Sequence, residues 1–275
     1  MALIRAKDGL SETVTRFDVE APRIAQVCRP GQFVIVRLGD GAERIPLTIA
    51  AADPDAGTIT LIIQAVGKST ADLCDLGVGD DIRDVAGPLG RPTDLLAAGH
   101  AVCVGGGVGT AVTWPIARAL ADRGVAVTAI VGARTASGLI LTDELAEIGD
   151  VVVCTEDGSA GRKGLVTDAL ADVIATKPVN RVYAVGPVPM MRACAELTRP
   201  IQLDTVVSLN SIMLDGTGMC GGCRVSIGGQ SQYACVDGPE FDGHVVDFDS
   251  LADRLTTYAD FEAEAMRRRA CQVEV

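Results

Sequence analysis

The chain has 275 residues, of which 48% are hydrophobic and only 3% aromatic, and its formal net charge is −12 at pH 7. That composition allows a large core built mainly from aliphatic side chains, and the negative charge argues against a nucleic-acid partner, whose phosphates it would repel. The sequence has no long apolar run of membrane-span length, and its start lacks the basic and apolar segments of a signal peptide. We therefore expect a cytoplasmic protein of more than one domain.

The first 96 residues carry short β-rich segments and few helical signals. Segments 32–38, 44–53 and 58–66 are rich in Val, Ile, Leu and Thr and are bounded by Gly, Pro or Asp, which is typical of strands. Helical periodicity is confined to residues 68–76. Several short strands separated by turn signals predict a small antiparallel β-barrel over residues 1–96.

From residue 97 onward, short apolar strands alternate with helical segments. This alternation predicts a parallel sheet covered by helices on both faces over residues 97–205. A cysteine-rich loop region over 206–244 and an acidic tail over 245–275 follow, so the fold class is α+β with several domains. In chain order we expect strand 100–107, helix 109–124, strand 125–134, helix 136–149, strand and loop 150–159, helix 165–177, and strand, turn and helix over 180–197.

The end of the chain is strongly acidic. Residues 236–275 contain ten Asp or Glu and four Arg, a net charge of −6. Charge runs of this kind are typical of a solvated surface helix. The alternative interpretation is a docking surface for a protein partner.

Nine cysteines in a cytoplasmic chain indicate metal or redox chemistry rather than disulfides. Three of them are clustered, and the others are scattered through the sequence. Because a free cysteine packs as a small hydrophobic side chain, we interpret the scattered ones as packing residues. They are Cys28, Cys74, Cys103, Cys154, Cys194 and Cys271.

Two short motifs of the barrel region have the chemistry of a phosphate and ring-binding site. Arg44 and Thr48 stand four residues apart on an expected strand, so their side chains point to the same side. Arginine pairs with phosphate, and threonine can hydrogen-bond a flat polar ring. Gly67, Ser69 and Thr70 precede the expected helix, where free amides bind phosphate or Ser and Thr act as ordinary N-caps. Taken alone, each motif is more typical of a solvated arginine or an N-cap.

A glycine cluster lies between the first strand and helix of the second region. In "VCVGGGVGTAV", residues 102–112, Gly105 and Gly107 match the dinucleotide fingerprint, whereas its third position is Thr110. The order of strand, glycines and helix favours dinucleotide binding over a plain turn. After the next strand an acid would favour NAD, whereas Arg134 is suited to the 2′-phosphate of NADP.

The third motif is a cysteine loop. Asp215, Cys220, Cys223 and Cys235 form the pattern D-x4-C-x2-C-x11-C, which matches plant-type [2Fe–2S] spacing with Asp in the first position. The glycines of this loop favour a cluster. A zinc site with three Cys and Asp, or with His244 as a substitute ligand, remains an alternative, as does a C-x-x-C redox disulfide.

The motifs follow one another along the chain as barrel motifs, glycine cluster and cysteine loop. With this order the chain resembles the ferredoxin–NADP reductase superfamily up to about His244. It resembles more closely the branch with a C-terminal [2Fe–2S] loop, which implies FAD, a [2Fe–2S] cluster and NAD(H) as cofactors. The resemblance places Arg44 near the FAD phosphates and Thr48 near its ring. The cofactor residues it implies are Pro46, Leu47, Gln64, Val66, Gly67, Ser69 and Thr70 for the flavin, and Gly105, Gly106, Gly107, Val108, Gly109, Thr110, Asp157, Gly158, Gly186 and Pro187 for the nucleotide.

Within this branch, the dihydroorotate dehydrogenase type has four cysteines, whereas the NADH-dependent reduced ferredoxin:NADP oxidoreductase type has Asp in the first position, as here. The resemblance implies an electron-transfer subunit that exchanges hydride with NAD(H) and passes single electrons to a larger partner. That assembly is expected to be a ferredoxin:NADP(H) transhydrogenase, with electron bifurcation as an option. Thr48 is the only candidate catalytic donor. Alternatives are a subunit of a dihydroorotate dehydrogenase or hydrogenase, a free-standing flavin reductase, and a zinc-containing nucleotide sensor without redox activity.

Overall fold

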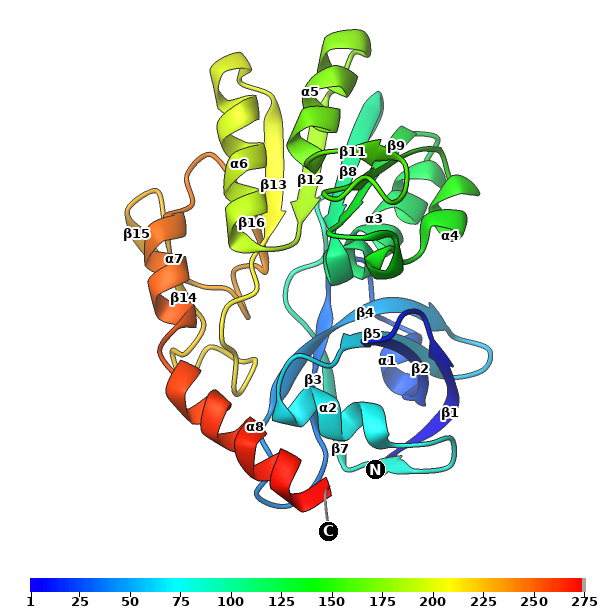
Figure 1. Cartoon of the computed structure of the whole chain (residues 1–275), viewed down its shortest axis with the longest axis vertical. Coiled ribbons are helices and arrows are strands. Elements are labelled where there is room, and N and C mark those ends of the chain that lie inside the picture. Colours follow the sequence, from blue (N-terminus) through cyan, green and yellow to red (C-terminus); the bar gives the residue numbers. More distant parts are fainter. Residues whose placement is uncertain (274–275) are drawn as a thin grey trace.

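The computed structural model describes residues 1–273 and contains two seven-stranded sheets, a two-stranded hairpin and a pair of C-terminal helices. Figure 1 shows the antiparallel sheet below and, above it, the sheet of the region expected to bind a nucleotide (residues 97–205, the nucleotide region), with the C-terminal helices running down one side. Among the described residues, no helix is long and apolar enough to cross a membrane.

The first sheet confirms the expected antiparallel barrel. Its strand order is β6-β1-β2-β5-β4-β3-β7. The two edge strands, β6 and β7, are separated in the chain only by Arg83, so the sheet curls back on itself. The strands are β1 (Ala2–Gly9), β2 (Val14–Glu20), β3 (Phe33–Arg37), β4 (Ile45–Asp53), β5 (Thr58–Gln64), β6 (Asp81–Ile82) and β7 (Asp84–Leu89), with helices α1 (Pro22–Ala25) and α2 (Lys68–Asp75).

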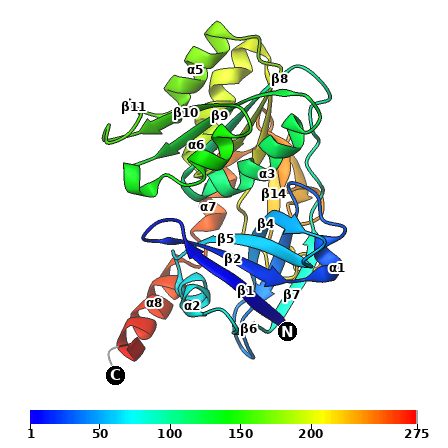
Figure 2. The ribbon, with the colours of Figure 1, turned by 90° about the vertical axis from the view of Figure 1, so that its right-hand side faces the viewer.

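The second sheet is parallel except at one edge, in the order β11-β10-β9-β8-β12-β13-β16. Helices α3 and α4 pack on one face and α5 and α6 on the other, and α3 lies between this sheet and the barrel (Figure 2). The strands are β8 (His100–Gly106), β9 (Ala126–Ala133), β10 (Asp150–Thr155), β11 (Arg162–Lys163), β12 (Arg181–Val185), β13 (Asp204–Ser208) and β16 (Glu240–Asp242); the helices are α3 (Thr110–Ala121), α4 (Thr142–Ala146), α5 (Val166–Thr176) and α6 (Val188–Thr198).

Two features differ from the sequence-based expectation. The helix expected over residues 136–149 is reduced to a 3₁₀ turn at Ala136–Gly138 and to α4, because Leu141 adopts a left-handed conformation with φ of 58° before α4 begins. The edge strand β16 belongs to the cysteine-rich region and pairs antiparallel with β13. The nucleotide region and the cysteine-rich region therefore share one sheet.

The acidic tail forms two helices with different environments. In α7 (Phe248–Leu255), the side chains of Phe248 and Leu251 are buried, so a purely solvated tail was the wrong expectation for this part. Helix α8 (Ala259–Val273) is largely exposed, but the Arg269 guanidinium lies 2.8 Å from the carboxylate of Asp72 and 2.5 Å from that of Asp75. Figure 1 shows α8 beside α2. The tail thus packs on the chain's own barrel.

The apolar core is continuous between these parts. One cluster of buried side chains joins Phe33 and Ile35 of the barrel to the faces of β8 and α5, and to Cys223, Cys235 and Phe248. A second cluster joins the barrel strands β2, β4 and β5 to α3. The barrel is therefore held against the nucleotide region by shared hydrophobic packing.

Candidate cofactor sites at the junction of the two sheets

A cavity of about 1200 Å³ opens between the barrel and the parallel sheet. The barrel contributes β4 and β5, and the nucleotide region contributes its glycine loop and the carboxyl ends of several strands. Ligands of open α/β sheets bind at this end of the strands. The cavity brings together predicted residues from both halves of the chain: Pro46, Leu47, Thr48, Gln64, Val66, Thr70, Gly106, Gly107, Val108, Gly109, Arg134, Gly186 and Pro187.

The glycine loop is shaped by close contacts that leave no room for side chains. A Cβ at Gly109 would lie 2.2 Å from the carbonyl oxygen of Val185, and one at Gly106 would lie 2.5 Å from the Met190 sulfur. Gly105 faces the fully buried Thr110 instead of the cavity. Thr110 therefore occupies the third fingerprint position as a packing residue, which explains why this variant of the motif still forms the loop.

The start of α2 carries the predicted pyrophosphate residues in two different roles. The Thr70 hydroxyl accepts hydrogen bonds from the amides of Val66 (3.1 Å) and Gly67 (3.0 Å), so it caps the helix. The Ser69 hydroxyl donates to the carboxylate of Glu43. Val66 and Thr70 line the cavity, whereas Gly67 and Ser69 do not. Both side-chain hydroxyls are engaged, so this turn offers a phosphate its first-turn amides.

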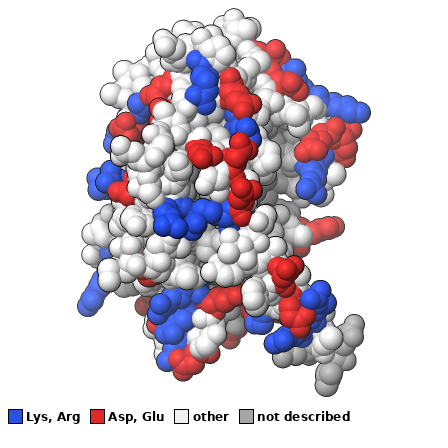
Figure 3. All heavy atoms as spheres, turned by 90° about the vertical axis from the view of Figure 1, so that its left-hand side faces the viewer, with Lys and Arg blue, Asp and Glu red and all other residues white. Residues whose placement is uncertain are grey.

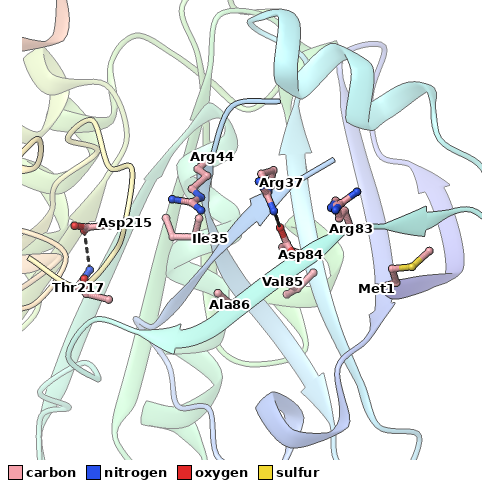
Figure 4. Close-up of a pocket in the computed structure, with 10 residues that line it drawn as sticks. All are labelled: Met1, Ile35, Arg37, Arg44, Arg83, Asp84, Val85, Ala86, Asp215 and Thr217. Carbon is pink, nitrogen blue, oxygen red and sulfur yellow. Dashed lines mark hydrogen bonds and ion pairs between the residues drawn. The ribbon is translucent and has the colours of Figure 1, made fainter. Parts of the chain in front are cut away.

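Arg44 does not share the cavity with Thr48. It lines a second hollow of about 570 Å³ between β3, β7 and the cysteine loop, together with Arg37, Arg83 and Asp215 (Figure 4). Because β4 begins at Ile45, strand alternation does not extend to Arg44, and a common side for Arg44 and Thr48 stays a prediction.

The nucleotide end of the large cavity carries one acid and one base. Glu156 follows β10, and Arg134 follows β9; both line the cavity. Asp157 and Gly158 do not line it. The Asp157 carboxylate accepts hydrogen bonds from the hydroxyl (2.7 Å) and amide (2.9 Å) of Ser159, which lower its pKa.

Several cavity residues were missed at the sequence level. Glu156 stands beside Asp157 in "TEDGS", and its position after a strand was the available signal. The segment after β13 carries no motif that marks a binding site. Its lining residues are Leu209, Asn210, Ser211 and Met213, and those elsewhere include Ser208 at the end of β13, Leu165, Thr167 and Met190.

The cysteine loop brings two of the predicted ligands into contact. The sulfurs of Cys223 and Cys235 lie 3.1 Å apart, and both residues are buried. Backbone amides point at the thiols: Gly222 N lies 3.5 Å from the Cys220 sulfur, and Cys235 N lies 3.5 Å from the Cys223 sulfur. Amide donors directed at sulfur are the environment that iron–sulfur clusters have in proteins. Cys220 is exposed at the mouth of the loop.

Asp215 lies at the start of this loop, and its carboxylate is bound by the loop itself. It accepts hydrogen bonds from the amides of Thr217 (2.9 Å) and Cys220 (2.6 Å), and these bonds lower its pKa. Within residues 1–273, no three His, Cys, Asp or Glu side chains converge as a group that could hold a metal ion. The types of donor nevertheless suit an iron–sulfur cluster. The thiols of Cys223 and Cys235 are adjacent, the Cys220 thiol is exposed, and the Asp215 carboxylate is bound by the Cys220 amide.

His244 is not part of this arrangement. Its Nε2 lies 2.9 Å from the hydroxyl of Thr198, on α6, and its amide donates to Asp242 at 2.9 Å. The alternative in which His244 completes a zinc site therefore finds no support in the geometry.

The scattered cysteines differ in their exposure. Cys103, Cys154 and Cys194 are buried as expected, and Cys28 and Cys74 are half-buried. The packing interpretation is wrong for Cys271, which is exposed.

Comparison with known proteins agrees with this geometry. Residues 210–247 match the iron–sulfur cluster binding domain of dihydroorotate dehydrogenase B, and residues 103–196 match an oxidoreductase NAD-binding domain. The dihydroorotate dehydrogenase B (NAD(+)) electron transfer subunit homolog of Thermotoga maritima is 46% identical over 95% of this chain and 93% of its own length. The electron transfer subunit of dihydroorotate dehydrogenase B from Fusobacterium nucleatum is 35% identical over 78% of this chain and 85% of its own.

A solved structure also resembles this chain over nearly its whole length. A chain from the structure of NADH-dependent reduced ferredoxin-NADP oxidoreductase, described for flavin-based electron bifurcation, has a TM-score of 0.93 and 44% identity, with 98% of each chain covered. This likeness extends over both sheets and the cysteine loop. The chain therefore belongs to the family of dihydroorotate dehydrogenase B electron transfer subunits and their homologues, oxidoreductases of the ferredoxin–NADP reductase superfamily that carry an iron–sulfur domain.

Proposed function

We propose that this chain binds FAD, a [2Fe–2S] cluster and NAD(H), and passes electrons between NAD(H) and a larger partner subunit. The observation that carries the proposal is the shared cavity, in which barrel residues such as Thr48 face the glycine loop around Gly107. A flavin lying against the barrel and a nicotinamide lying against the glycine loop would meet there. When bound, these groups supply the hydride and single-electron chemistry.

The chain's own residues hold and align the ligands. Backbone at Gly107 can approach a pyrophosphate closely because this glycine lines the cavity and carries no side chain, and the first-turn amides of α2 are available to a second phosphate group. Pro46 and Leu47 supply an apolar wall, and Thr48 supplies a hydroxyl for the polar edge of a flavin ring.

For the cluster, we propose Asp215, Cys220, Cys223 and Cys235 as ligands. The amides of Thr217 and Cys220 hold the Asp215 carboxylate close to the cysteine loop. Replacing Asp215 with Ala is expected to change the visible and paramagnetic spectra of the cluster and to lower its iron content. An unchanged spectrum would show that Asp215 only shapes the loop.

We further propose that the partner is the large subunit of an NADH-dependent reduced ferredoxin–NADP oxidoreductase. Asp in the first ligand position and the likeness to a chain of that assembly support this assignment. A dihydroorotate dehydrogenase is the second candidate, because the relatives at 46% and 35% identity carry that name.

Anaerobic purification of the native complex, with mass spectrometry of co-eluting chains, distinguishes the two. A stoichiometric flavin and iron–sulfur protein with its own NADP site supports the transhydrogenase, and a dihydroorotate dehydrogenase chain supports the second candidate. A chain that elutes alone and turns over NADH with physiological acceptors is a free-standing reductase. A colourless protein with one zinc per chain is instead the nucleotide sensor.

A further inference from the structure

Helix α7 places an arginine against the cysteine loop. The Nη2 atom of Arg254 donates a hydrogen bond of 2.9 Å to the carbonyl oxygen of Gly222. Gly222 lies between two of the proposed ligands, and its carbonyl belongs to the peptide bond that leads into Cys223. The guanidinium therefore contacts the backbone of the loop at the turn between Cys220 and Cys223.

This contact is fixed by the packing of α7. Phe248 and Leu251 anchor the helix in the core, and the Asp247 carboxylate caps its first turn by accepting from the Ser250 amide at 3.0 Å. The amide of Asp247 in turn donates to the carbonyl of Ser226 at 3.0 Å. Ser226 belongs to β14 (Arg224–Ile227), which pairs with β15 (Gln230–Tyr233) and begins directly after Cys223. One rigid unit thus carries both the arginine and the ligand loop.

The charge of Arg254 is not balanced by a carboxylate. Among the side chains that the structure describes, no Asp or Glu oxygen lies within 4 Å of its guanidinium nitrogens, whereas Arg267, Arg268 and Arg269 of α8 all form ion pairs. Arg254 is also partly buried, so water screens it less than it screens the α8 arginines that face solvent. A positive charge is therefore presented to the loop.

We propose that Arg254 is a positioning residue that holds the loop between Cys220 and Cys223 and raises the reduction potential of the cluster bound there. Reduction adds one electron to the cluster, with no bond formed or broken, and the nearby guanidinium stabilises the added negative charge. The electron comes from the bound hydride carrier during turnover and from dithionite in a titration. The inference rests on the proposed function for the presence of the cluster.

The test is a mediated redox titration of the purified protein, with the reduced cluster followed by electron paramagnetic resonance. Arg254→Gln removes the charge but keeps a hydrogen-bond donor, and Arg254→Lys keeps the charge. Arg268→Gln is the matched control, because it removes one positive charge from the same C-terminal segment at an exposed position. We expect a lower midpoint potential in Arg254→Gln, recovery of most of the difference in Arg254→Lys, and no change in Arg268→Gln.

Other outcomes overturn the inference. A wild-type potential in Arg254→Gln, or equal shifts in the Gln and Lys variants, excludes the electrostatic role. If Arg254→Gln loses iron, the Lys variant decides: iron retained at a wild-type potential supports the proposal, and iron retained at a lowered potential contradicts it. Loss of iron in both variants leaves only a structural role and refutes the proposal. A wild-type protein without a [2Fe–2S] spectrum refutes the proposed function itself, whereas the other failures leave that function intact.

Discussion

Glu240 is a buried acid at the place where the barrel, the parallel sheet and the cysteine loop region meet. Its Oε1 accepts a hydrogen bond of 2.8 Å from the Thr93 hydroxyl, and its Oε2 has no partner among the described residues. Burial and, to a smaller extent, the charge of Asp94 raise the pKa of this carboxyl to about 7, although the hydrogen bond from Thr93 acts in the opposite direction. The other ionisable neighbour is Cys103, whose buried thiol stays protonated. Glu240 is therefore a neutral acid over much of the acidic pH range.

This raised pKa predicts a pH-dependent stability. Because the folded-state pKa of Glu240 exceeds its unfolded value, its contribution is fully present below pH of about 4.5 and is lost as pH rises through about 7. Relative to Glu240→Gln, the wild-type free energy of unfolding should fall by up to about 3 kcal/mol across that window. Urea unfolding at pH 5, 6, 7 and 8 measures this difference. Glu147→Gln, at an exposed position, is the control, and a pH-independent difference between wild type and Glu240→Gln would contradict the prediction.

Glu156 is predicted to select NAD over NADP. Its carboxylate lines the nucleotide end of the cavity, where it would hydrogen-bond a ribose hydroxyl and repel a 2′-phosphate. Glu156→Gln should therefore improve kcat/KM for NADPH relative to NADH by about tenfold, since removing a close like-charge contact is worth on the order of 1–2 kcal/mol. The neighbouring Asp157→Asn, outside the cavity, should leave the ratio unchanged; an equal effect of both substitutions would exclude a specific role for Glu156.

At the level of single residues, spacing in the sequence was sufficient to predict the position of some site residues and not of others. The glycines around Gly107 and the pair Cys223 and Cys235 could be found because their chemistry depends on neighbours in sequence. Arg44 could not be placed, since its direction depends on where β4 begins. Glu156 could not be distinguished from Asp157, because only the tertiary fold decides which of two adjacent acids faces the cavity.

Among the elements, α8 has a specific attachment to the barrel. Arg269 is only one-fifth exposed and pairs with two acids of α2. Arg269→Ala should lower the free energy of unfolding slightly, because ion pairs near the surface stabilise a protein only weakly. It should also speed proteolytic cleavage between α7 and α8, because the helix loses its fixed contact. Arg268→Ala, whose side chain is three-quarters exposed, should change neither. Equal proteolysis of both variants would show that other contacts hold α8.

Longer elements were predictable where one periodicity dominates. Helix α3 and the barrel strands follow from apolar patterns that the tertiary structure leaves unchanged. Strand β16 could not be predicted, because its three residues have no periodicity and its partner β13 lies more than thirty positions earlier. The shortened α4 depends on the backbone conformation of Leu141, which side-chain patterns do not report.

Across the whole molecule, the shared core predicts a single unfolding event. Two of the three hydrophobic clusters include residues from both sheets, so neither sheet can open without exposing apolar surface of the other. Trp114, the only tryptophan, is buried on α3 between them. Its fluorescence and far-ultraviolet circular dichroism should change at the same denaturant concentration. A tryptophan transition separated from loss of β-structure would show that the barrel unfolds independently.

The charged side chains are mixed on the surface and are not gathered into one acidic area. On the face that carries α6, α7 and α8, acidic and basic side chains are interspersed between uncharged areas (Figure 3). No single field of one sign covers this side of the molecule, although the chain carries a net charge of −12. Sequence counts overstate the acidity of the C-terminal segment at α7, because Arg192 of α6 pairs with Asp249 at 2.6 Å.

The position of β16 has a consequence for how the protein is made. Translation runs from the N-terminus, so the ribosome completes β13 well before it reaches β16, and the edge of β13 stays unpaired in the meantime. Cys220, Cys223 and Cys235 all emerge during this interval. The parallel sheet is therefore closed only after the last cluster ligand has left the ribosome, and a nascent chain released before residue 240 would expose an open strand edge of the kind that promotes aggregation.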